Sequence, residues 1–115
     1  MAAVDNSWAG ALLPRFLDLT ASRQIEIDIE RGNLEAGHDP LSAAEEIGKI
    51  AHKISGTAAT FGFGTLGKQA QAVEAICGNI RGLSGPAVAE MVQDRLLPAL
   101  DLLTQEFDVV LVAAT

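Results

Sequence analysis

The residue best suited to do chemistry in this chain is His52, because an imidazole gains or loses a proton near neutral pH. It lies in the stretch KIAHKISGTAATFGFG and is one of only 2 histidines. Residues three or four positions apart share a helix face, so Gly48 and Gly56 would flank His52 one turn before and one turn after it. A glycine inside a helix costs about 1 kcal/mol relative to alanine. Two such glycines indicate that a partner surface can lie flat against the helix and reach the ring.

The same features have a second interpretation. A histidine at a helix edge is often a solvated or structural residue, and helical glycines often let two helices pack closely. His38 is a weaker candidate, since it lies in a predicted loop beside Asp39 and Pro40. No pair of histidine, cysteine or carboxylate residues has metal-ligand spacing. The chain also has neither a Walker A loop nor a glycine-rich dinucleotide motif, so it has no recognisable route to bind ATP.

Helical segments must position His52. We expect them at about Leu12–Leu34, from Asp39 or Pro40 to about Phe61, at about Thr65–Ile80, and from Ser84 or Gly85 to beyond Leu103. The second has the clearest helical periodicity, with apolar residues every three or four positions. The predicted core stripes of the first three segments are Leu12, Phe16, Leu19, Arg23, Ile27 and Leu34; Ala44, Ile47, Ala51, Ile54, Ala58 and Phe61; and Leu66, Val73, Ile76, Cys77 and Ile80. Short connections between amphipathic helices predict an all-α fold, an antiparallel four-helix bundle. Pro98 should kink or divide the last helix.

Three local features leave alternatives open. The run QIEIDIE alternates like a strand, but its flanks are helical and no turn residues isolate it, so we predict a helix. Asp39 can cap the second helix with Pro40 at its first position, and Ser42 with Glu45 has the spacing of a capping box. The ending FDVVLVAAT is apolar enough to pack against the bundle or to remain a sticky end.

The composition sets broad limits. The chain has 115 residues, of which 49% are hydrophobic, so we expect one domain over residues 1–115 with a substantial core. Its net charge of −7 argues against nucleic acid as a partner. A single cysteine, Cys77, excludes an internal disulfide and favours a reducing compartment. No signal peptide or apolar run of membrane-spanning length is evident, and no dimerising heptad is evident. We therefore expect a cytoplasmic monomer that does not enter membranes.

The stretch AHKISGTAATFGFGTL resembles the phosphorylated helix of histidine-containing phosphotransfer (HPt) domains. It is similar in particular to the N-terminal phosphotransfer domain of the chemotaxis histidine kinase. The family pattern is histidine, any residue, an aliphatic residue, lysine, glycine, two small residues, two variable residues, an apolar residue and glycine. Here the pattern begins at His52 and ends with Phe61 and Gly62. It departs from the family at one place, where Ser55 stands in place of the lysine.

This resemblance implies a four-helix bundle with one solvent-facing histidine that carries a phosphoryl group. The group would come from, or go to, an aspartate on a response-regulator receiver domain, and a histidine kinase can also supply it. Such a domain has no kinase activity and no cofactor of its own. The receiver brings both the aspartate and the Mg²⁺.

The resemblance also assigns roles around the ring. One imidazole nitrogen attacks the phosphoryl group, and a hydrogen-bond acceptor on the next helix holds the proton on the other nitrogen. Glu74 matches the position of that acceptor, and Gln71, one turn earlier, is a second candidate. Alternatively, Glu74 is an ordinary solvated residue.

The missing family lysine calls for another cation. Lys49 lies one turn before His52, and we expect it to replace the lysine from the other side, while Lys53 helps to bind the partner. Lys68 is a weaker alternative. Ser55 can donate a hydrogen bond but carries no charge, and Gly56 would leave access to the ring. A small apolar docking face is expected near Ile47, Gly48, Ala51, Gly56 and Ala59, with the alternative that Ile47 and Ala51 belong wholly to the core.

The main functional hypothesis is a phosphocarrier in two-component or phosphorelay signalling, with His52 as the covalent site. The alternative is a degenerate HPt-like module that docks on receivers or kinases without carrying phosphate, which the serine at position 55 keeps open. A helical bundle with an incidental histidine is a third, weaker hypothesis.

Overall fold

The structure, a computed structural model, describes the backbone of residues 7–113 and the side chains of residues 10–113. Its elements in chain order are α1 (Ser7–Ala36), α2 (Pro40–Ala58), the short 3-10 helix η1 (Ala59–Phe61), α3 (Gly64–Ile80), α4 (Pro86–Met91), the π-helical turn η2 (Val92–Leu96) and α5 (Leu97–Ala113). No strand occurs among these described residues, so the predicted all-α fold is confirmed.

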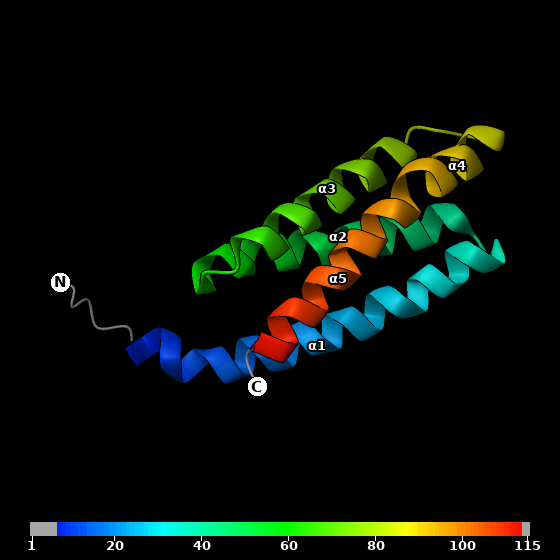
Figure 1. Cartoon of the computed structure of the whole chain (residues 1–115). Coiled ribbons are helices and arrows are strands. Elements are labelled where there is room, and N and C mark those ends of the chain that lie inside the picture. The colour runs from blue at the N-terminus through cyan, green and yellow to red at the C-terminus, as the bar shows by residue number, and fades with distance from the viewer. Residues whose placement is uncertain (1–6, 114–115) are drawn as a thin grey trace.

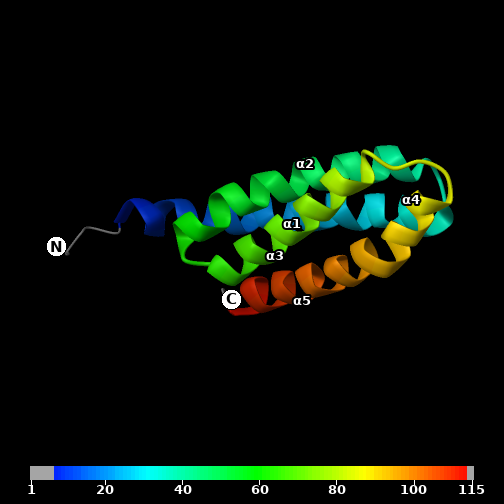
Figure 2. The ribbon, with the colours of Figure 1, turned by 90° about the horizontal axis from the view of Figure 1, so that it is seen from above.

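Four helical rods form the bundle, and the last of them consists of α4, η2 and α5. Figure 1 shows how they are arranged. Helix α2 packs against α1 and α3, and α5 packs against α3 and α1, which closes the ring. The connections between the rods are short, so neighbouring rods run antiparallel. Helix α1 has 30 residues and α2 has 19, and the first turns of α1 project beyond the other helices (Figure 2). The predicted four-helix bundle is therefore confirmed.

The core consists of aliphatic side chains at helical spacing. In α2 and α3 its members include Ala44, Ile47, Ala51, Ile54, Ala58, Leu66, Val73, Ile76, Cys77 and Ile80. All ten stand at the stripe positions predicted from the sequence. Because these side chains fix how α2 and α3 are rotated about their own axes, they also decide which residues face solvent.

The alternating run in α1 is helical, as predicted. Ile27 is 1% exposed, whereas Ile25 and Ile29 are 62% and 61% exposed. A strand would place all three on one face, but a turn of about 100° per residue places Ile25 and Ile29 opposite Ile27. The helical flanks therefore decided the conformation over the local alternation.

Helix α1 begins at Ser7, several residues before the predicted start. Two residues of its predicted apolar stripe, Leu12 and Leu19, are exposed, whereas Phe16 and Leu34 are buried. Because Phe16 and Thr20 on either side of Leu19 are buried, other helices cover α1 at this level, and the exposure of Leu19 follows from the face of α1 on which it stands.

Helix α2 begins at the first of the two predicted caps. The Asp39 carboxylate accepts a hydrogen bond from the backbone N–H of Ser42 at 3.3 Å, and Pro40 is the first helical residue. This satisfies one of the free N–H groups at the helix start. The alternative start, with Ser42 and Glu45 as a capping box, is wrong.

Three stacked aromatic rings connect the segment that follows α2 with α1. The Phe16 ring stacks on Phe61 with centroids 4.6 Å apart and on Phe63 with centroids 5.5 Å apart. Such pairs add about 0.5–1.5 kcal/mol beyond the area they bury. The stack holds the turn after α2, and so helps to set the position from which α3 starts.

The last rod is divided near Pro98, as predicted. It starts after Gly85, with Pro86 as the first helical residue, and the π-helical turn Val92–Leu96 separates α4 from α5. Proline lacks an N–H and its ring clashes with the carbonyl four residues earlier, which lies inside this π-helical turn. The wider turn is where the helix accommodates the ring.

The apolar C-terminal run packs on one side only. Phe107 and Val110 are buried, whereas Val109 and Val112 are 57% and 71% exposed. The run therefore packs against the bundle along one face of α5 and leaves its other face exposed. The last two residues of the run lie outside the described residues.

Candidate functional site

His52 projects from the outer face of α2. Its side chain is 73% exposed, although the preceding residue, Ala51, is completely buried. The difference follows from helical spacing, because the core positions turn inward and one further step of about 100° turns His52 outward. A reactant arriving from solvent can therefore reach the ring.

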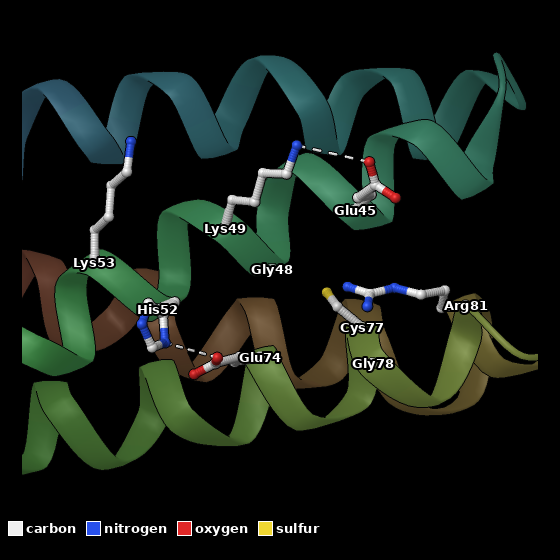
Figure 3. A pocket seen from close by; sticks show the side chains of 9 residues that line it. All are labelled: Glu45, Gly48, Lys49, His52, Lys53, Glu74, Cys77, Gly78 and Arg81. Atoms are coloured by element: carbon white, nitrogen blue, oxygen red, sulfur yellow. Dashed lines mark hydrogen bonds and ion pairs between the residues drawn. The ribbon is translucent and has the colours of Figure 1, made fainter.

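The His52 ring contacts a carboxylate of the neighbouring helix. Nδ1 of His52 lies 2.8 Å from Oε2 of Glu74 on α3, and the Glu74 side chain is 38% exposed (Figure 3). A carboxylate only accepts hydrogen bonds, so the ring nitrogen facing it carries the proton. In the neutral imidazole Nε2 then holds the free lone pair. Nε2 makes no hydrogen bond with any described residue.

Gln71, the second candidate acceptor, does not contact the ring. It is exposed one turn before Glu74 on α3, and no side-chain hydrogen bond to it is present in the part of the chain that the structure describes. Of the two candidates, the structure brings only Glu74 to His52.

Lys49 is paired with carboxylates of its own helix. Its ammonium lies 3.6 Å from the Glu45 carboxylate and 3.2 Å from that of Glu46. The hydrogen bond with Glu46, together with the charges of both carboxylates, raises the pKa of Lys49. In Figure 3 the Lys49 side chain runs toward Glu45 and away from the His52 ring. To meet a group on the ring it would have to leave these carboxylates.

Lys53 and Ser55 also fall short of replacing the family lysine in this conformation. The Lys53 side chain is exposed and extends away from His52 (Figure 3). The Ser55 hydroxyl donates to the backbone carbonyl of His52 at 2.9 Å. Its proton is therefore used inside the helix, and only its oxygen lone pairs remain available. Lys68 is exposed on α3 but does not line the groove beside His52.

The two glycines flanking His52 differ in what they permit. A Cβ atom on Gly48 would lie 3.1 Å from Cβ of Cys77, whereas a Cβ atom on Gly56 would meet nothing within 4 Å. Gly48 therefore serves the close packing of α2 on α3, which was the alternative interpretation of the glycines. Only Gly56 leaves open space beside the histidine.

Part of the predicted docking face also belongs to the packed core. Ile47 and Ala51 are completely buried in the core, so they cannot touch a partner. Gly56 and Ala59 are exposed, and because both residues are small, few side-chain atoms project from the helix surface after His52. Helical periodicity agrees with this division, because Ile47 and Ala51 stand on the apolar stripe of α2 whereas Gly56 and Ala59 do not.

A groove of about 440 Å³ runs between α2 and α3 beside the ring. It is lined by Glu45, Gly48, Lys49, His52, Lys53, Glu74, Cys77, Gly78 and Arg81. A second hollow of about 310 Å³ continues it toward the start of α2 and shares Glu45, Cys77 and Arg81 with it. Cys77, Gly78 and Arg81 were not predicted as site residues. Their spacing from Glu74 places Gly78 and Arg81 on its face of α3, so the signal was present in the sequence.

Cys77 forms part of the groove floor as a protonated thiol. Burial, and to a lesser extent the charge of Glu74, raises its pKa to about 12. At neutral pH this thiol is therefore protonated and a weak nucleophile. Among the described residues no cluster of three or more histidine, cysteine, aspartate or glutamate side chains could hold a metal ion.

Comparison with known proteins identifies the family. Residues 16–110 match the family model of the Hpt domain, which covers most of the chain. No curated protein and no solved structure matches it significantly. The narrower similarity to the chemotaxis kinase domain therefore stays a prediction. Hpt domains interact with receiver domains and histidine kinases. An exposed histidine on such a bundle agrees with this match, and we conclude that the chain belongs to the Hpt domain family and has a phosphotransfer role in two-component signalling.

Proposed function

We propose that this protein is a phosphocarrier that accepts a phosphoryl group on His52 from a receiver-domain aspartate and can return it. One observation carries the proposal: an exposed imidazole has its Nδ1 2.8 Å from the Glu74 carboxylate. This arrangement directs the free lone pair of Nε2 away from the carboxylate. An imidazole held in this way is a nucleophile that needs no further base.

In the proposed step, Nε2 of His52 attacks the phosphorus of the receiver's aspartyl phosphate. The Nε2–P bond forms as the bond between phosphorus and the aspartate oxygen breaks, and the bonding electrons leave on the aspartate carboxylate. The Nδ1 proton stays on the ring, which becomes a cationic phosphoimidazole. Glu74 stabilises that cation through a charge-assisted hydrogen bond. Return of the group to an aspartate is the reverse of this step.

The partner supplies the remaining chemistry. We expect the receiver to bring the aspartate and a Mg²⁺ ion, and this chain to use no cofactor of its own. The transfer needs the reacting atoms in line and about 3–3.5 Å apart. The low surface beside Gly56 and Ala59, both exposed, leaves room for that approach.

Lys49 is proposed to balance the phosphoryl charge after it leaves Glu45 and Glu46. The Lys49 side chain is exposed, and exposed ion pairs are weak because water and salt screen them, so exchanging carboxylate partners for phosphoryl oxygens changes little free energy. Lys49 should therefore adjust the rate and the stability of the phosphorylated form without being essential. Lys53 is proposed to assist partner binding.

Location and assembly stay proposals. No described helix combines the length and the apolar character that a membrane span requires. We propose a cytoplasmic monomer that meets its partners transiently.

The decisive experiment uses the other histidine as a control. The protein is incubated with a receiver domain carrying ³²P on its aspartate, and acid-labile label on this chain is followed over time. We expect label on the wild type and on His38→Ala, whose side chain lies in the exposed loop before α2, but none on His52→Ala. Label that persists in His52→Ala would refute His52 as the acceptor.

A docking module without phosphotransfer is the second candidate. Two observations favour it: the serine at position 55, and a Lys49 that is occupied by two carboxylates. It predicts that a receiver binds but leaves no acid-labile label. Absence of both binding and label would instead indicate a structural bundle.

A further inference from the structure

We propose that Arg81 is a docking residue that binds a carboxylate on the receiver surface and so guides the receiver to His52. This inference rests on the proposed function and names a recognition element for it. Arg81 is the C-terminal cap residue of α3. It stands seven residues after Glu74, which is two helical turns or about 10 Å along the helix.

Arg81 belongs to the same surface as the histidine. It lines both the groove beside His52 and the hollow that continues it past Glu45. In Figure 3 its guanidinium does not point away from the molecule but extends back along the groove toward Cys77. A partner that covers His52 and lies along this groove would therefore meet the guanidinium.

The guanidinium is also free to bind a partner. Arg31 is paired with Glu35 and Asp101, and Arg23 donates to Thr57. Lys49, another cation of the groove wall, is held by Glu45 and Glu46. Lys53 also lines the groove, but its side chain extends away from His52 (Figure 3). Arg81, by contrast, has no ion pair or side-chain hydrogen bond with any described residue.

The charges of this chain and of its partner indicate which group of the partner Arg81 binds. The chain carries a net charge of −7, which repels an acidic partner at long range. A receiver approaching with an aspartyl phosphate is itself anionic at the reacting site, so a local cation is needed to orient it. The planar guanidinium matches a carboxylate with two parallel hydrogen bonds, which lysine cannot do. A carboxylate beside the receiver's phosphorylation site is therefore the group that Arg81 would bind.

A purely structural role for Arg81 makes a different prediction. A cation at a helix C-terminus is stabilised by the helix dipole, and that contribution is present with or without a receiver. The test must therefore measure something that the dipole does not change: the dependence of transfer on receiver concentration and on salt.

The experiment compares single-turnover transfer from a phosphorylated receiver, the one that labels His52, for the wild type, Arg81→Ala and Arg81→Lys. The control is Arg95→Ala, which removes the same charge from an exposed position in η2, outside the groove. We expect Arg81→Ala to lower the second-order transfer rate about fivefold at low salt, as expected for one charged contact at an interface rim. The limiting rate at saturating receiver should be unchanged. Arg81→Lys should recover part of the loss, and Arg95→Ala should behave as the wild type.

Two further measurements separate an effect on docking from an effect on the transfer step. The difference between the wild type and Arg81→Ala should disappear near 1 M salt, where screening acts over about 3 Å. With phosphoramidate as a small phosphodonor, which needs no docking, both proteins should be labelled equally fast. The inference is overturned if Arg81→Ala matches Arg95→Ala with the receiver, or if it is equally slowed with phosphoramidate. If phosphoramidate labels His52 but no receiver does, the receiver partnership itself fails, and this inference with it.

Discussion

The hydrogen bond between His52 and Glu74 gives the sharpest quantitative prediction. Glu74→Ala removes the acceptor, whereas Glu74→Gln leaves an amide oxygen in about the same place but without charge. The two substitutions therefore separate the hydrogen bond from the charge.

The magnitude follows from the exposure of the two groups. A hydrogen bond to a charged group contributes about 1.5–3 kcal/mol, but here the side chains are 73% and 38% exposed, so screening by water reduces it. We take about 1 kcal/mol for the whole contact, because exposed charged pairs seldom exceed that value. Charge-assisted bonds are roughly twice as strong as neutral ones. Glu74→Ala should then slow phosphotransfer about fivefold, and Glu74→Gln about twofold, since 1.4 kcal/mol corresponds to a factor of about ten.

Two measurements test this prediction. Transfer from a phosphorylated receiver is followed at saturating receiver, with Glu90→Gln as a control for loss of one exposed acidic charge on α4. Nitrogen-15 NMR of the unphosphorylated ring reports which nitrogen carries the proton. We expect Nδ1–H in the wild type and a larger share of Nε2–H in Glu74→Ala. Wild-type transfer rates together with an unchanged tautomer in Glu74→Ala would show that the carboxylate does not orient the ring.

Three further predictions concern the surroundings of the ring. Lys49→Ala should slow transfer and shorten the lifetime of the phosphorylated form by less than about fivefold; equal values for variant and wild type would remove Lys49 from the mechanism. Gly48→Ala should be less stable than Gly56→Ala by about 1–3 kcal/mol in chemical denaturation, because both gain helix propensity but only the first overpacks against Cys77. Equal stabilities would contradict the close packing at Gly48. Because its pKa is raised to about 12, the Cys77 thiol should react with iodoacetamide at pH 8 far more slowly in the folded protein than in urea; similar rates would mean that the thiol is accessible.

The candidate site could be predicted from the sequence because its central contact depends on helix geometry. His52 lies one step beyond the core residue Ala51 on a strongly periodic helix, so its exposure followed from the pattern. Glu74 could be placed beside it once the family resemblance set the register of α3 against α2. The observed 2.8 Å contact lies where that register puts it, while the catalytic roles of both residues stay predictions.

The cations around the ring were harder to place. Lys49 shares a face with His52, but the sequence also puts Glu45 and Glu46 four and three residues before it, and the side chain pairs with these carboxylates. Arg81 was missed because it stands far from His52 along the chain. Only the packing of α3 on α2 brings its guanidinium into the groove.

The sequence alone therefore determined the number of helical rods, the division of the last rod near Pro98, and the outward face that carries His52, while it left two starts open for the second helix. These features depend on local backbone chemistry and on a period of 3.6 residues, which a single helix already possesses. The tertiary structure decided which of two glycines is a packing contact, which acceptor reaches the ring, and that Arg81 lines the groove beside it. Each of these depends on the distance and rotation between two helices, which are set by the fit of side chains across the core and not by the pattern along either helix.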